Sequence, residues 1–206
     1  MTRALTRLRD TLRAHVTGHA PDIAAFCGTA LAADHRLAPV TPRDLPATRL
    51  LPGALKTAEP PLAPVIRAIV DAAPHVAWRH SYAPTDLGIG AGFLDRSGWF
   101  NLIAPSGPFV HPGLRLSIGI WDAGLHYPRH WHAPEEIYLV LSGPATFLSD
   151  GRAPRVARPG DTVHHAPNQP HAAQMGDAPL LAAAFWTGRD LEVPSTLAPL
   201  PDEATT

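Results

Sequence analysis

The first third of the chain shows the spacing of amphipathic helices. Apolar residues recur three and four positions apart in three segments, the period that places side chains on one face of a helix. These residues are Leu5, Leu8, Leu12 and Val16, then Ile23, Phe26, Cys27 and Leu31, and finally Leu62, Val65, Ile66, Ile69 and Val70. Pro21 and Asp22 predict the start of the second helix, and Pro74 predicts the end of the third. Residues 37–61 hold several prolines and are expected to form a loop.

From about residue 93 the pattern changes to short apolar runs of the kind that form strands. The runs are GWFNLIAP, LRLSIGIWDA, EIYLVLSG, ATFLSDG, RVARPGD, TVHHAP and LLAAAFWTG, with Pro-Gly, Ser-Gly and Asp-Gly turn signals between them. Short strands at this spacing are typical of an antiparallel sandwich or barrel. Residues 75–82 are a further candidate strand. The Gly-rich residues 83–92 are expected to form a loop, a candidate lid, because their GxGxG lacks the strand-to-helix context of a dinucleotide site.

Composition narrows the functional classes. With 206 residues, 17 basic and 18 acidic side chains and a net charge of −1, the chain gives no electrostatic reason to expect nucleic acid or an anionic membrane as a partner. Cys27 is the only cysteine, which excludes a disulfide framework and a Cys-rich zinc module. The N-terminus carries Arg every few residues and no continuous apolar run, so we expect neither a secretory signal nor a membrane span. We therefore expect a cytoplasmic protein. The 12 histidines are the unusual count, because histidine is the commonest metal ligand.

One predicted strand carries a polar face. His130, His132, Glu136 and Tyr138 all have even numbers, and residues two apart on a strand point to the same side. The odd-numbered Ile137, Leu139 and Leu141 point to the other side, while Glu135 is expected to face solvent. The polar face must meet either water or a metal. The His-x-His pair alone is weak evidence, but together with Glu136 it is a set that suits Zn²⁺, Fe²⁺, Mn²⁺ or Co²⁺.

The spacing around these residues is similar to that of a known superfamily. Gly124, His130-x-His132, Glu136 and Gly143 closely resemble the first motif of the cupins, and the second motif is matched more loosely by Gly151, Pro159-Gly160-Asp161, Pro167 and His171. The resemblance implies a mainly β protein, a single cupin (double-stranded β-helix or jelly-roll) barrel with an N-terminal α-helical extension. It also implies that His171 is the last metal ligand. His164 and His165 are interpreted as strand or rim residues, with a ligand role as the lesser alternative. The expected division is a helical portion at 1–80, the metal-binding barrel at 81–195 and a tail at 196–206.

A narrower resemblance concerns the run from Tyr127 to Tyr138. Tyr127-Pro128-x-His130-x-His132-Ala133-x-Glu135-Glu136-x-Tyr138 is similar to the cupin-type dimethylsulfoniopropionate (DMSP) lyases, and further matches are Trp78-Arg79, GWFNLIAPSG at 98–107 and Trp186. The resemblance implies cleavage of DMSP to dimethyl sulfide and acrylate. It implies that His132, Glu136 and His171 bind one divalent metal ion, with His130 as a fourth ligand or close neighbour. Tyr138 is then the general base, and Tyr127 takes part in substrate binding or catalysis.

The residues agree with a β-elimination. A sulfonium already carries a good leaving group, so the difficult step is removal of a weakly acidic C–H proton. A metal near the substrate carboxylate would stabilise the developing charge and favour the tyrosinate form of a nearby tyrosine. Trp186, with Trp131 or Trp99, could supply a cation–π contact to the sulfonium.

Other readings stay open at this point. Tyr138 could pack at a barrel end, Tyr127 could be a turn residue and Trp186 could belong to the core. The barrel could also belong to an iron-dependent dioxygenase, or to a non-lyase cupin that acts on or binds another small carboxylate, because cupins host many activities. In every case we expect a small-molecule ligand. The choice between a monomer and a homodimer is open.

Overall fold

The computed structural model describes residues 1–86 and 88–198. Its helices are α1 (Thr2–His19), α2 (Pro21–Cys27), the 3₁₀ helix η1 (Pro46–Leu50), α3 (Leu51–Lys56), α4 (Ala63–Ala72), the 3₁₀ helix η2 (Ala73–His75) and α5 (Ala91–Leu94). The three amphipathic segments form α1, α2 and α4, as predicted. Helix α2 ends earlier than expected, before Leu31, because the chain turns at Gly28 with a positive φ of 52°, a conformation that glycine adopts at no steric cost.

The segment 37–61 is more ordered than its proline content predicted. It contains η1 and α3, and Pro46 and Pro52 both lie in the first turn of their helices. Proline is tolerated there because the first N–H groups of a helix have no partner within the helix. The strand expected at 75–82 is also wrong: this stretch makes only isolated bridges, Ala77 to Arg43 and Arg79 to Trp99.

The rest of the described chain is β structure. The strands are β1 (Arg36–Leu37), β2 (Ser97–Ala104), β3 (Phe109–Val110), β4 (Arg115–Trp121), β5 (His126–Trp131), β6 (Glu135–Ser142), β7 (Ala145–Ser149), β8 (Arg155–Ala157), β9 (Thr162–His165), β10 (His171–Met175), β11 (Leu180–Thr187) and β12 (Thr196–Leu197). They form a seven-stranded sheet in the order β1-β3-β2-β4-β11-β6-β9 and a five-stranded sheet in the order β12-β5-β10-β7-β8. Every ladder is antiparallel except β2 with β3.

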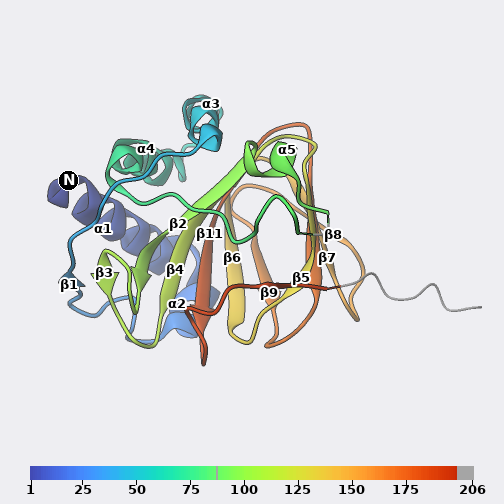
Figure 1. Ribbon diagram of the computed structural model, residues 1–206. Coiled ribbons are helices and arrows are strands. Elements are labelled where there is room, and N and C mark those ends of the chain that lie inside the picture. Colours follow the sequence, from blue (N-terminus) through green and yellow to red (C-terminus); the bar gives the residue numbers. More distant parts are fainter. Residues whose placement is uncertain (87, 199–206) are drawn as a thin grey trace, which may run out of the picture.

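The two sheets face each other across a buried cluster, and this is the predicted cupin barrel. Side chains from both sheets meet in that cluster, among them Tyr138 of β6, Phe147 of β7 and Ala173 of β10. Helices α1, α2 and α4 cover the outer face of the seven-stranded sheet (Figure 1). The mainly β class with an N-terminal helical extension is therefore confirmed.

Burial on both faces explains the composition of the central strands. In β11, Leu181, Ala183 and Phe185 pack against the helices, while Leu180 and Ala182 face the barrel interior. Strands that are covered on both sides read as continuous apolar runs, which is the character of LLAAAFW. The inner face of this sheet is thus left to pack against the five-stranded sheet and to line the site.

The expected tail at 196–206 begins with β12, which pairs with β5, and residues 199–206 lie outside the described residues. Leu87 of the predicted lid loop also lies outside them. Among the residues described, no helix is both long and apolar enough to cross a bilayer.

Candidate metal centre and pocket

Strand register brings the predicted ligand residues together. His130 of β5 lies opposite His171 of β10, and Glu136 of β6 lies opposite both Trp186 of β11 and His165 of β9. His132 follows β5 directly. The four predicted ligand residues are 1–4% exposed. The barrel interior therefore holds a buried cluster of three imidazoles and a carboxylate.

Backbone carbonyls fix the orientation of the three imidazoles. The Nδ1 atoms of His130, His132 and His171 lie 2.8, 2.9 and 2.8 Å from the carbonyl oxygens of Pro128, Pro134 and Gln169. A carbonyl only accepts hydrogen bonds, so each Nδ1 donates, and in a neutral ring the lone pair is then on Nε2. In histidines that bind metals, the ring nitrogen that does not contact the metal typically donates such a hydrogen bond.

The Nε2 atoms converge on the carboxylate. Oε2 of Glu136 lies 3.2 Å from Nε2 of His132 and 3.4 Å from Nε2 of His171, and the buried Nε2 of His171 makes no hydrogen bond with residues 1–86 or 88–198. With neutral rings, acceptor atoms face one another, an arrangement that a bound cation relieves. The donor atoms of His130, His132 and His171 lie within 4.8 Å of one another. This cluster is able to hold a metal ion, and its nitrogen and oxygen donors accept several divalent metals.

His165 is a member of the cluster that the sequence interpretation underrated. Its side chain is fully buried and stacks on His171 with ring centroids 3.9 Å apart. Nδ1 contacts the Ser149 hydroxyl at 3.1 Å, and Nε2 has no hydrogen-bond partner among the residues that the structure describes. Glu136, His165 and His171 form a second group of donor atoms within 4.8 Å. The neighbouring His164 instead points outward and contacts Glu135 at 2.6 Å, with both side chains about 40% exposed.

Electrostatics keep His130, His165 and Glu136 in the forms that a metal requires. Burial, followed by the nearby His171, holds the pKa of His130 well below 6.5, and burial lowers the pKa of His165 to about 3. Burial alone would raise the pKa of Glu136, but His132 and His171 together hold it well below its usual value. The imidazoles of His130 and His165 are therefore neutral and the carboxyl group is ionised at physiological pH.

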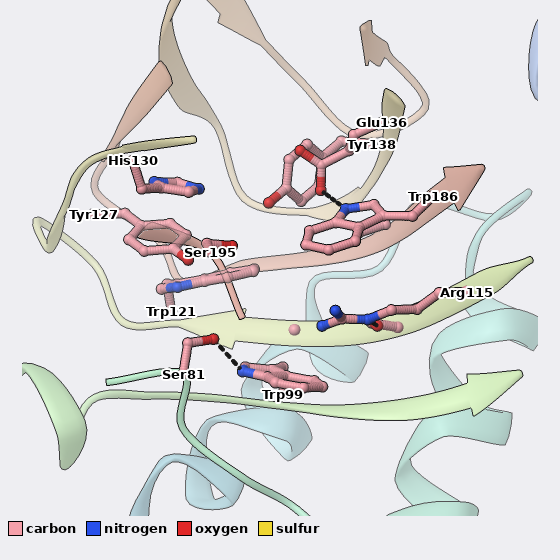
Figure 2. Close-up of a pocket in the computed structure, with 13 residues that line it drawn as sticks. Ser81, Trp99, Arg115, Trp121, Tyr127, His130, Glu136, Tyr138, Trp186 and Ser195 are labelled. Atoms are coloured by element: carbon pink, nitrogen blue, oxygen red, sulfur yellow. Dashed lines mark hydrogen bonds between the residues drawn. The ribbon is translucent and has the colours of Figure 1, made fainter. Parts of the chain in front are cut away.

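A small cavity opens beside the cluster on the inner face of the seven-stranded sheet (Figure 2). Its lining residues are Ser81, Trp99, Arg115, Ser117, Gly119, Trp121, Tyr127, His130, Glu136, Tyr138, Ala184, Trp186 and Ser195. The indole of Trp121 lies over Gly119, where any side chain would collide with it. The cavity thus combines two cluster residues, two tyrosines, three indoles and one arginine.

Both predicted tyrosines reach this cavity. Tyr138 shares the inner face of β6 with Glu136; burial, then the Glu136 charge, raises the pKa of Tyr138 well above 10. Tyr127 stacks on His130 with ring centroids 4.1 Å apart, and its hydroxyl lies 3.4 Å from that of Tyr82. Strict alternation would separate Tyr127 from His130. The β5–β10 ladder shifts register between them, and such a bulge turns both side chains inward.

The two predicted tryptophans differ. Trp186 lines the cavity, where its Nε1 donates to Oε1 of Glu136 at 2.5 Å and its ring stacks on His132. Trp131 is not brought to the site: its side chain is 37% exposed and it does not line the cavity. Trp131 lies between His130 and His132, and alternation sends it to the opposite side of the strand. The sequence interpretation did not single out Arg115, Ser117 or Trp121.

The sequence is similar to a known family and to a named relative. A family model described as dimethylsulfoniopropionate lyase matches residues 23–182. The dimethylsulfoniopropionate lyase DddQ of Ruegeria pomeroyi is 38% identical over 163 residues, which cover 77% of this chain and 80% of that protein.

Two solved structures are similar over nearly the whole chain. A chain from the crystal structures of the DMSP lyases RdDddP and RnDddQII superposes with a TM-score of 0.89 and 36% identity, covering 96% of this chain and 99% of its own. The crystal structure of DMSP lyase DddQ from Ruegeria pomeroyi superposes with a TM-score of 0.86 and 33% identity, covering 96% and 98%.

Proposed function

The chain belongs to the dimethylsulfoniopropionate lyase family and is a carbon–sulfur lyase, and we propose that it cleaves DMSP to dimethyl sulfide and acrylate with Tyr138 as the general base. The observation that carries the proposal is the shared face of β6. Glu136 of the metal-ligand cluster and Tyr138 lie two residues apart on this face and line one cavity. A substrate in that cavity would contact both groups.

The proposed metal ligands are His130, His132, Glu136 and His171. Two observations support this assignment: the Nε2 and carboxylate atoms converge, and the buried Nε2 of His171 has no hydrogen-bond partner in the described part of the chain. A divalent ion held there would supply positive charge that polarises the substrate carboxylate and favours the ionised form of Tyr138. His165 is a candidate further donor.

The proposed reaction needs one protein base and no protein acid. The oxygen of ionised Tyr138 takes the proton from the carbon next to the substrate carboxylate. The C–H electron pair becomes the carbon–carbon double bond of acrylate, and the carbon–sulfur bond breaks with its electron pair on sulfur. Dimethyl sulfide leaves as a neutral molecule, and the proton stays on the tyrosine until solvent takes it.

Two features of the protein bear on the acidity of Tyr138. Burial, and after it the Glu136 charge, raises the pKa of Tyr138, while the guanidinium of Arg115 acts in the opposite direction. In the apo form the phenol is therefore neutral at pH 7. The proposal accordingly requires that lyase activity depends on added metal.

Substitution of the base tests the proposal. Metal-loaded protein is expected to release dimethyl sulfide from DMSP in a headspace assay. Y138F is expected to lower the rate by about 10²- to 10⁴-fold while metal analysis shows unchanged occupancy. Y82F removes a hydroxyl that lies near Tyr127 but outside the lining of the cavity, and it should keep the rate within a few-fold. Near-normal release by Y138F would reject Tyr138 as the base, and tight metal binding without release by the wild type would reject the lyase assignment.

A further inference from the structure

Arg115 is a buried cation that forms no salt bridge within the described residues, although the Glu136 carboxylate lies within its electrostatic reach. It lies on β4 with 8% exposure, and no carboxylate of residues 1–86 or 88–198 forms an ion pair with it. Nε donates to Oδ1 of Asn101 and to the hydroxyl of Ser117, both at 3.1 Å, and Nη1 donates to the carbonyl of Leu191 at 3.2 Å. Nη2 has no hydrogen-bond partner in the part of the chain that the structure describes. Buried charges are normally paired, so this one needs an explanation.

Two indoles fix the position of the guanidinium. Its central carbon lies 4.1 Å from the ring centroid of Trp186 and 4.6 Å from that of Trp99. Figure 2 shows Arg115 between these two rings at the cavity. The stacking and the hydrogen bonds hold the planar fork in one orientation, so little side-chain entropy is lost when a ligand binds to it.

The guanidinium remains charged at physiological pH. Burial lowers the pKa of Arg115 to about 10, which still leaves it almost entirely protonated at neutral pH. Glu136, Tyr127 and Tyr138 all lie within its electrostatic reach. The Arg115 guanidinium, which is charged and held in place, therefore lines the same cavity as Tyr138, the candidate base.

We propose that Arg115 binds the ligand carboxylate in this cavity, beside the metal-ligand cluster, and sets the specificity of the cavity for small carboxylates. The guanidinium fork matches a carboxylate, to which it donates charge-assisted hydrogen bonds. Arg115 and Tyr138 line the same cavity, so a carboxylate held by Arg115 lies in the cavity of the candidate base. That the carboxylate belongs to DMSP rests on the proposed function, whereas carboxylate recognition by Arg115 does not.

These contacts give Trp186 a different role from the cation–π contact to the sulfonium that the sequence suggested. His132 and the Arg115 guanidinium already stack on its ring at 4.0 and 4.1 Å, and its N–H is bonded to Glu136. Trp186 therefore positions the carboxylate site and the metal-ligand cluster relative to each other. The aromatic wall that remains for a sulfonium is made by Trp121 and Tyr127, which stack on each other at 5.7 Å.

A pair of isosteric probes tests the proposal without turnover. Propionate and the uncharged propionamide are titrated by calorimetry into metal-loaded wild type, R115M, R115K and R79M. We expect the wild type to bind propionate and not propionamide. R115M should bind propionate about tenfold to a hundredfold more weakly, with unchanged metal content and circular dichroism. R115K keeps the charge without the fork and should be intermediate.

R79M is the matched control. The Arg79 guanidinium also stacks on Trp99, at 5.3 Å, but Arg79 does not line the cavity, so propionate binding should be unchanged. With DMSP as substrate, R115M should raise KM more than it lowers kcat. Propionate binding by folded R115M or R115K equal to that of the wild type would overturn the proposal. If wild type binds propionate through Arg115 yet releases no dimethyl sulfide, the lyase assignment fails and the carboxylate site stands.

Discussion

At the scale of single residues, His165 shows what a one-strand pattern leaves out. Alternation along one predicted strand placed His130, His132, Glu136 and Tyr138 on a single face. The single strand was wrong: His130 lies on β5 of the five-stranded sheet, whereas Glu136 and Tyr138 lie on β6 of the seven-stranded sheet, and the barrel brings the four together between its two sheets. His165 belongs to another strand, and it joins the cluster only because β9 pairs with β6 in one particular register. That register depends on contacts between distant segments, which a single sequence does not reveal.

We expect H165A to weaken metal binding. Loss of a nitrogen donor, or of a ring stacked on the proposed ligand His171, should lower the affinity for the metal by about 10- to 100-fold. The measurement is competition against a chromophoric chelator with Zn²⁺ and Co²⁺, together with the Co²⁺ absorption spectrum. The adjacent His164 faces outward, so H164A is the control and should leave affinity unchanged. Equal affinities and spectra for both variants would show that His165 has no part in the metal centre.

Trp131 and Arg115 are opposite cases of what the sequence could show. The odd number of Trp131 between two even-numbered histidines was enough to predict that it faces away from them, so the signal was present in the sequence. Arg115 lies in LRLSIGIWDA, where nothing local indicates that its neighbours in space are two indoles and the cavity that Glu136 and Tyr138 also line. Its role depends on the pairing of β4 with β2 and β11.

At the scale of elements, alternation divides β11 between two tasks. Phe185 is fully buried in the core between the sheet and the helices, and the next residue, Trp186, lines the cavity. One strand thereby anchors the helical layer and builds the site. The prediction of helices and strands succeeded where a long periodic pattern existed. It failed at 37–61, where prolines in the first turns of helices were interpreted as a loop. It also failed at 75–82, where an extended segment with only isolated bridges was interpreted as a strand.

Substitution of Phe185 should separate these two tasks. We expect F185A to lower the free energy of unfolding by about 3–5 kcal/mol, because it leaves a cavity in a packed core. The measurement is urea denaturation, with metal affinity determined on the folded variant, which should be close to that of the wild type. V156A changes a strand residue that is 55% exposed and should cost less than about 0.5 kcal/mol. A loss below about 1 kcal/mol for F185A would contradict the packing of the helices on β11.

At the scale of the whole molecule, the family and the fold could be predicted from the sequence, because the spacing of the two cupin motifs indicates both. The expected resemblance to DMSP lyases is confirmed by the family model and by the relatives. The boundaries drawn at residues 80 and 195 remain predictions. One hydrophobic cluster runs without interruption from Leu8 of α1 through Ile66 of α4 to Leu116 and Phe185 of the sheet. A continuous core of this kind favours cooperative unfolding of helices and barrel together.

L8A tests that cooperativity with two local probes. Four of the five tryptophans lie on strands β2, β4, β5 and β11, so the fluorescence change reports mainly on the barrel. Cys27 lies in α2, where burial raises the pKa of its thiol to about 12, so a disulfide reagent labels it only when the helical layer opens. Leu8 is fully buried, and L8A should cost about 2–5 kcal/mol and shift the denaturation midpoints of both probes equally. Labelling of Cys27 at a lower urea concentration than the fluorescence change would show instead that the helical portion unfolds on its own.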